Sequence, residues 1–433
     1  MVGGVTEVTD ERAVAARRAV EAVWHIESGR LVAGLARVTG DLGLAEDLAQ
    51  EALVAALEQW PVSGIPPNPG GWLMTTAKRR GIDAHRRTVT FERKAAVLAR
   101  EAVADEPGVD TDSRVDSLDD HVGDDLLRLV LTACHPVLSL ESRVALTLRC
   151  LGGLSTDEIA RAFLVPEPTM AQRIVRAKKT LTDKGVRFEL PTADELSDRL
   201  GPVLEVVYLI FNEGYAATSG QDWVRPALCQ EAMRLGRVLA GLVPDEPEAL
   251  GLLSLMELQA SRLPARLGAD GRPVLLPDQD RRRWDRLLVR RGLESLARAE
   301  ASGRPLGPYA VQAAIAACHA RALRPEDTDW YLVAELYDVL RTIWPSPVVE
   351  VNRAVAVGFS RGPDAGLVVV DRVVASGRLA GYPHLHAVRG DLLERAGRHT
   401  EAADAFERAA SLTRSEAERS IFTGRARAAR TAT

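Results

Sequence analysis

Residues 154–182 of this 433-residue chain read LSTDEIARAFLVPEPTMAQRIVRAKKTLT, and they predict two helices joined by a short turn. Ser155 and Glu158 have the spacing of a capping box, in which each side chain bonds the other residue's backbone amide, so a helix is expected to begin there. The segment 164–168 carries two prolines, which interrupt a helix. Beyond it, apolar residues recur at helical spacing and predict the buried face of a second helix: Met170, Ile174, Ala177 and Leu181.

The outward face of this second helix is polar and basic, formed by Thr169, Gln172, Arg173, Arg176 and Lys179. In a DNA-binding helix-turn-helix the second helix enters the major groove, and its first residues contact base edges. Arg173 suits guanine and Gln172 suits adenine, while Arg176, Lys178 and Lys179 suit phosphates. A plain helical hairpin with a basic face is the structural alternative.

Charge is sorted along the first half of the chain, although the whole sequence has 55 Lys and Arg against 60 Asp and Glu. Residues 41–60 carry a net charge of −5, 71–100 of +6, 101–125 of −9 and 168–187 of +5. Two basic segments separated by an acidic one predict two polyanion contacts joined by a linker. Solvated helix faces would account for any one of these blocks.

Upstream of the acidic linker, residues 41–60 predict an acidic amphipathic helix whose candidate buried residues are Leu44, Leu48, Leu53 and Leu57. A proline-rich loop at 61–69 and a basic helix follow. Trp72, Leu73, Ala77 and Ile82 are expected inside that helix, and Lys78, Arg79, Arg80, Arg86 and Arg87 outside.

The AEDLAQE run at 45–51, the W-L-x-x-x-A pattern from Trp72, the I-D-x-x-R-R pattern from Ile82 and the distant helix-turn-helix occur together. In this combination the chain resembles an extracytoplasmic-function (ECF) sigma factor, a small bacterial sigma-70 relative with only the second and fourth conserved regions. The resemblance covers about residues 14–187.

The resemblance implies a role for each matching position. Asp47, Gln50 and Glu51 match the helix that binds the clamp helices of the largest subunit of core RNA polymerase. Residues 62–69, including Asn68, match the loop that holds a flipped base of the −10 element. The residues that match the helix lying along the melted −10 strand are Lys78, Arg79, Asp83, Arg86 and Arg87. The residues that match the −35-reading helix are Thr169, Gln172, Arg173, Arg176 and Lys179. Core packing is the favoured role of Trp72.

About 240 residues follow Phe188, and helical periodicity continues almost to the end. Gly390, Leu393, Gly397, Ala402, Phe406 and Ala409 fall at the small and apolar positions of a tetratricopeptide repeat. The architecture resembles the ECF subgroup with a tetratricopeptide-like C-terminal extension, which implies that the extension regulates the sigma part. Two further segments look like motifs without a known pattern: 208–220 (YLIFNEGYAATSG) and 263–285.

Several classes of function are not favoured by the sequence. Four dispersed cysteines and histidines without ligand spacing predict neither a disulfide scaffold nor a metal site. No phosphate-binding glycine loop occurs, and no spacing makes Glu213, Asp278, Asp280 and His319 a catalytic cluster. We therefore expect no catalytic residues, no cofactor and no enzyme activity. Without an apolar leader or membrane span, we expect a cytoplasmic protein without membrane contact.

The sequence predicts an all-α fold: two small helical sigma domains joined by an acidic linker, then a large helical, tetratricopeptide-like C-terminal part. The predicted limits are 12–100 for sigma region 2, 101–123 for the linker, 124–187 for region 4, 192–289 for a middle domain and 290–429 for the repeats. The predicted function is an alternative sigma factor whose partners are core RNA polymerase, promoter DNA and an unidentified effector of the C-terminal part. The alternatives are a helix-turn-helix regulator that does not bind polymerase, and a repeat scaffold without a DNA role.

Overall fold

The computed structural model describes residues 4–80, 122–163, 165–191, 193–215, 225–268, 274–413 and 415–432. Throughout these ranges the chain forms α-helices and short 3-10 turns, and no β-strand occurs in them, which confirms the all-α prediction. The chain divides into two compact units, residues 1–207 and 208–433. The predicted domain limits remain predictions.

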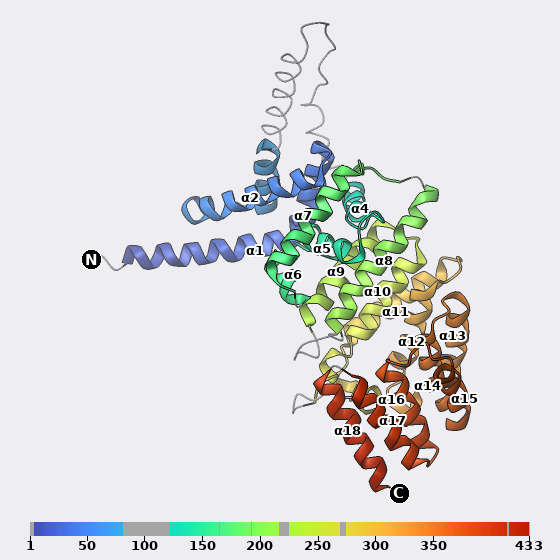
Figure 1. Ribbon diagram of the computed structural model, residues 1–433. Helices are drawn as coiled ribbons and strands as arrows, with labels where there is room; N and C mark the ends of the chain where they lie inside the picture. Colours follow the sequence, from blue (N-terminus) through green and yellow to red (C-terminus); the bar gives the residue numbers. More distant parts are fainter. Residues whose placement is uncertain are drawn as a thin grey trace. The chain divides into compact units, whose positions relative to one another are not determined.

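The first unit begins with α1 (Gly4–Thr39) and α2 (Leu42–Ser63), which lie side by side (Figure 1). Asp41 caps α2, since its side chain accepts a hydrogen bond from the Leu44 amide. α2 continues through Pro61 and ends at Ser63. The next helix covers residues 69–80, so the loop between the two helices is shorter than the loop predicted at 61–69.

The buried face of α2 differs from the prediction. Leu48 is buried and Leu53 half-buried, but Leu44 and Leu57 are exposed. Small residues cover most of the contact instead, because alanines allow α2 to approach α1 closely. The buried residues of α2 are Leu42, Ala45, Glu46, Leu48, Ala49, Ala52, Ala55, Ala56 and Trp60.

Four more helices are described in the first unit before α8 (Ala193–Tyr215): α4 (Val122–Ala133), α5 (Leu140–Cys150), α6 (Thr156–Ala162) and α7 (Glu167–Asp183). The capping box of Ser155 and Glu158 is present at the start of α6. The four apolar residues predicted for the inward face of α7 are all buried. Pro168 lies in the first turn of α7, where proline is tolerated because its amide would be unpaired anyway.

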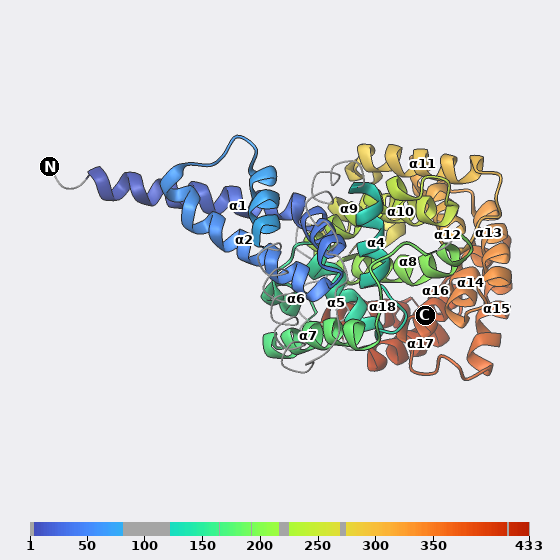
Figure 2. The same ribbon diagram turned by 90° about the horizontal axis from the view of Figure 1, so that it is seen from above.

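The second unit holds the remaining helices, each packed against its neighbours in sequence from α12 onward (Figures 1 and 2). They are α9 (Pro226–Leu242), α10 (Pro247–Ala260), α11 (Arg286–Ala301), α12 (Pro308–Arg321), α13 (Trp330–Ile343), α14 (Pro347–Arg361), α15 (Pro363–Ala375), α16 (Pro383–Arg395), α17 (His399–Leu412) and α18 (Glu416–Thr431). Short 3-10 turns lie at Leu263–Ala265, Leu276–Asp278, Arg281–Arg283 and Pro325–Asp327.

The pair formed by α16 and α17 explains the small residues that suggested a repeat. Gly390 is buried, and a Cβ there would lie 2.8 Å from the Phe406 ring. Leu393, Ala402 and Ala409 are buried beside them. These positions therefore form a close helix–helix contact, while the assignment as a tetratricopeptide repeat stays a prediction.

Candidate nucleic-acid interface

The outward face of α7 carries four exposed polar side chains, Thr169, Gln172, Arg176 and Lys179, with Arg173 half-buried beside them. Met170, Ile174, Ala177 and Leu181 fix the opposite face against α5 and α6. The helix is thus held rigidly, and all five predicted −35-reading residues lie on its free side. Guanidinium, ammonium and amide groups in this arrangement suit phosphates and base edges.

A second candidate surface lies on α2. Asp47, Gln50 and Glu51 are spaced by three and four residues, so they share one face of the helix. The side chains of Asp47 and Glu51 are 71% and 59% exposed. Glu51 also binds Arg80, whose Nη1 lies 3.3 Å from Glu51 Oε2 and donates to the Glu51 carbonyl. Arg80 was expected on the free basic face, so the structure gives it a second role in joining the two helices.

The predicted −10 residues fall on the helix at 69–80 and beyond it. Asn68 caps this helix, since its Oδ1 accepts a hydrogen bond of 3.0 Å from the Gly71 amide. Lys78 is half-buried and Arg79 is exposed. Leu73 and Ala77 are buried as predicted, and the half-buried Trp72 meets Trp60 edge-on with ring centroids 5.6 Å apart. Asp83, Arg86 and Arg87 lie outside the described residues, as does the acidic linker.

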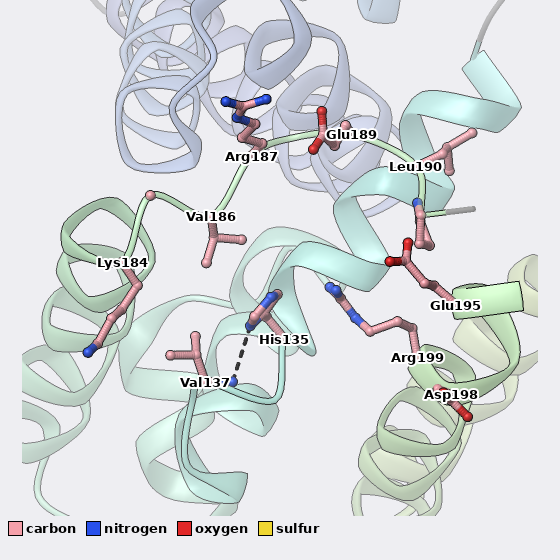
Figure 3. A pocket seen from close by; sticks show the side chains of 12 residues that line it. His135, Val137, Lys184, Val186, Arg187, Glu189, Leu190, Glu195, Asp198 and Arg199 are labelled. Atoms are coloured by element: carbon pink, nitrogen blue, oxygen red, sulfur yellow. Dashed lines mark hydrogen bonds between the residues drawn. The ribbon is translucent and has the colours of Figure 1, made fainter. Parts of the chain in front are cut away.

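An open cavity of about 890 Å³ lies where the segment that follows α7 passes the turn between α4 and α5 (Figure 3). His135 and Arg199 point into it, and Nδ1 of His135 accepts a hydrogen bond of 3.1 Å from the Val137 amide. Burial and then the charge of Arg199 lower the pKa of His135, so this imidazole is neutral at pH 7. Basic and acidic residues line the walls together, which gives the cavity no preference for one sign of charge. No group of three His, Cys, Asp or Glu side chains suited to a metal ion occurs in the described part of the chain.

Comparison with known proteins gives each part of the chain a counterpart. Residues 26–90 match the family Sigma-70 region 2, and residues 128–181 match Sigma-70, region 4. The chain is 31% identical over 155 residues to the ECF RNA polymerase sigma factor SigL of Mycobacterium tuberculosis, covering 81% of that protein. The chain belongs to the extracytoplasmic-function sigma-70 family. It therefore has a sigma-factor role in transcription initiation, and this family is not an enzyme family.

Two further relatives extend this comparison. The probable ECF RNA polymerase sigma factor SigI of Mycobacterium tuberculosis is 29% identical over 40% of this chain and 58% of its own length. An uncharacterized protein of Rhizobium meliloti is 45% identical over 89% of both chains, so it shares the C-terminal extension as well. Residues 199–300 of that extension match a family of unknown function (DUF6596). No solved structure matches the chain.

Region 2 and region 4 of this ECF sigma factor contact each other through a buried carboxylate. Glu46 of α2 is only 4% exposed, and its Oε1 accepts a hydrogen bond of 2.9 Å from Arg149 Nε of α5. Its Oε2 accepts a second hydrogen bond from Lys178 of α7, which also lies 3.4 Å from Asp47. Burial alone would lower the pKa of Lys178, but the charge and hydrogen bond of Glu46 raise it, so the ammonium stays charged.

Three further contacts join the same two regions. The Trp24 indole donates to the Gly153 carbonyl at 2.9 Å, and Thr182 donates to Asp41 at 3.1 Å. Arg37 pairs with the buried Asp125 at 3.1 Å. A Cβ at Gly153, where φ is +66°, would lie 2.6 Å from Ser28 Oγ, so the loop before α6 fits against α1 only as glycine.

Sequence reasoning missed Glu46 as a connecting residue and assigned Lys178 to phosphate. The signal was present, because Glu46 lies four residues after Leu42 and three before Ala49, both on the apolar face of α2. A carboxylate in such a position needs a buried cationic partner. The sequence alone does not say which cation this is, since Arg149 and Lys178 are more than 100 residues away.

Proposed function

We propose that this chain is an alternative sigma factor that binds core RNA polymerase through α2 and directs promoter-specific initiation. In this proposal α7 reads the −35 element, the segment from Asn68 through the basic helix melts and holds the −10 element, and the C-terminal extension regulates both. The single observation that supports it most is that the exposed carboxylates of Asp47 and Glu51, with Gln50 beside them, lie on a different helix from the basic recognition residues of α7. Complementary charge of this kind steers association and fixes its orientation.

The contact around Glu46 supports a further step in this function. The −10 and −35 elements lie about 25 base pairs apart, or roughly 85 Å at about 3.4 Å per base pair. With Glu46 of region 2 bonded directly to Lys178 on the recognition helix, the two regions cannot reach both elements at once. The free chain is therefore in a closed state, and loading onto polymerase and promoter separates Glu46 from Arg149 and Lys178.

Size-exclusion chromatography with purified core RNA polymerase at low ionic strength tests the proposal. The wild-type chain should co-elute with core enzyme, whereas the double variant Asp47→Arg and Glu51→Arg should elute separately. Glu58→Arg is the matched control, because Glu58 is an exposed acidic residue of the same helix that lies two turns beyond the predicted contact residues. Wild-type chain that elutes apart from core enzyme while it still binds promoter DNA would instead support a helix-turn-helix regulator that needs no polymerase.

A further inference from the structure

The two motif-like segments at 208–220 and 263–285 have no part in the proposed function, yet the structure brings residues from both together. Tyr215 ends α8, Arg262 and Arg266 follow α10, and Arg281 and Trp284 lie at the 3-10 turn before α11. The Asp285 amide donates to the Ser261 carbonyl at 2.8 Å. This hydrogen bond holds the segment that follows α10 beside the 3-10 turn that precedes α11. We call these five residues the arginine cluster.

Two aromatic rings link the guanidinium groups of the arginine cluster. The Cζ atom of Arg262 lies 5.7 Å from the centre of the Tyr215 ring and 5.9 Å from that of Trp284. Arg266 lies 3.8 Å from the Tyr215 ring, and Arg281 lies 5.3 Å from the Trp284 ring. Three positive charges are therefore gathered around two rings.

The cluster contains buried hydrogen-bond donors that have no acceptor among the described residues. Trp284 is 3% exposed and Arg281 is 4% exposed. The indole Nε1 of Trp284 and the Nε of Arg281 nevertheless have no hydrogen-bond partner in the described ranges. The same holds for the hydroxyl group of the buried Tyr215 and for Nε of Arg262. Buried polar groups are nearly always hydrogen-bonded, so four such donors in one place indicate an acceptor that completes them.

Arg262 differs from the other two arginines in its partners. Arg281 donates to the carbonyls of His319 and Ala322, each at 2.9 Å, and Arg266 donates to the Tyr215 carbonyl. The half-buried Arg262 side chain, by contrast, donates no hydrogen bond to the described residues and forms no ion pair with them. Because Arg262 is half-buried whereas Arg266 and Arg281 are buried, it is the arginine that an incoming ligand would meet.

The local field has the sign that an anion requires. Burial is the main cause that lowers the pKa of His319 to about 4, and the positive charges of Arg262 and Arg281 lower it further. Glu326 and Asp327 partly offset the charge of Arg281, whereas Arg262 forms no ion pair with the described residues. A partly buried positive charge without a counter-charge is unfavourable, and an anion relieves it. Guanidinium groups form paired, charge-assisted hydrogen bonds with phosphate and carboxylate groups alike.

We propose that the arginine cluster binds a small oxyanion, a ligand bearing a phosphate or carboxylate group, with Arg262 as its accessible charged partner. Trp284 and Tyr215 supply neutral donors beside it. The C-terminal extension is then the ligand-binding part of the chain. This inference goes beyond the sigma-factor function and does not depend on it, because the site lies wholly within residues 208–433.

Isothermal titration calorimetry of the full chain tests the site, with inorganic phosphate in one arm and succinate in the other, at constant ionic strength set with sodium chloride. We expect saturable binding at one site per chain in at least one arm, and the arm that binds distinguishes phosphate from carboxylate ligands. Arg262→Met should lower that affinity at least tenfold. Arg290→Met, an exposed arginine of α11, is the matched control and should bind as wild type.

Two results would overturn the proposal. The first is the absence of saturable heat from both phosphate and succinate with the wild-type chain. The second is an Arg262→Met chain that keeps its helical circular dichroism and titrates as wild type. If Arg262→Met does not fold, Arg262→Lys tests the proposal instead, because lysine keeps the positive charge but lacks the planar guanidinium group that donates paired hydrogen bonds. It should bind more weakly than wild type, and unchanged affinity would contradict the assigned role of Arg262.

Discussion

Glu46 of region 2 accepts a hydrogen bond of 2.9 Å from Arg149 of region 4, and the same carboxylate is bonded to Lys178 of the recognition helix. One buried side chain thus joins the two predicted DNA-binding parts of the chain. Since a carboxylate in this position is favourable only while both cations face it, the contact behaves as a unit that is either made or broken.

Replacing Glu46 with alanine should destabilise the chain. The substitution leaves Arg149 and Lys178 partly buried without their counter-charge, and breaking a buried pair in this way costs about 3–5 kcal/mol. Urea unfolding followed by circular dichroism measures the effect. Asp47→Ala is the control, because its exposed carboxylate contributes less than about 1 kcal/mol. Equal stability of the two variants would mean that the Glu46 contact does not form in solution.

Separation of the two regions on loading should be visible by fluorescence energy transfer. The native cysteines are all buried, so labels can be placed on cysteines introduced at two exposed residues, Glu58 of α2 and Asp157 of α6. We expect efficient transfer in the free chain and a large loss of transfer after addition of core enzyme and promoter DNA. Transfer that is equally weak in the free chain would contradict the closed state.

The stability of the second unit should fall in mild acid because of His319. Its folded pKa of about 4 lies below the usual 6.5, so the unfolded chain takes up a proton first as the pH falls. The stabilisation is fully present above pH 6.5 and is lost progressively down to pH 4, by about 3 kcal/mol in total at about 1.4 kcal/mol per unit.

Urea unfolding at a series of pH values, in buffer without phosphate, measures this loss. His319→Phe keeps the ring contact with Trp330 but removes the titrating group, so the difference between wild type and variant isolates His319. Parallel pH profiles for the two proteins would show that His319 is not held neutral.

Two glycines of the C-terminal helices should respond oppositely to alanine. Gly390→Ala places a Cβ 2.8 Å from the Phe406 ring and should destabilise the chain by about 1–3 kcal/mol. Gly424→Ala lies in α18 with nothing within 4 Å of the new Cβ and should stabilise it by about 0.5–1 kcal/mol. Thermal unfolding of both variants gives the comparison, and a stabilising Gly390→Ala would mean that α16 and α17 are not in close contact.

Local patterns predicted the parts of the structure that depend on neighbouring residues. The capping box at Ser155, the buried stripe of α7 and the helical character of both units follow from spacing alone, because helix periodicity and caps are local. The face of α2 was only partly predicted, since Leu44 and Leu57 are exposed where close packing favours alanine. Glu46 and the arginine cluster were missed, because their partners are distant in sequence and only the tertiary fold brings them together.

Run-off transcription with purified core RNA polymerase on a library of genomic promoters tests the central claim most directly. Core enzyme supplemented with the wild-type chain should give discrete transcripts from a small set of promoters. The double variant Arg173→Ala and Arg176→Ala should lose most of that signal, because it removes two cations of the recognition helix. If the wild-type chain yields no transcript beyond those of core enzyme alone, the chain does not act as a sigma factor under these conditions and the account is contradicted.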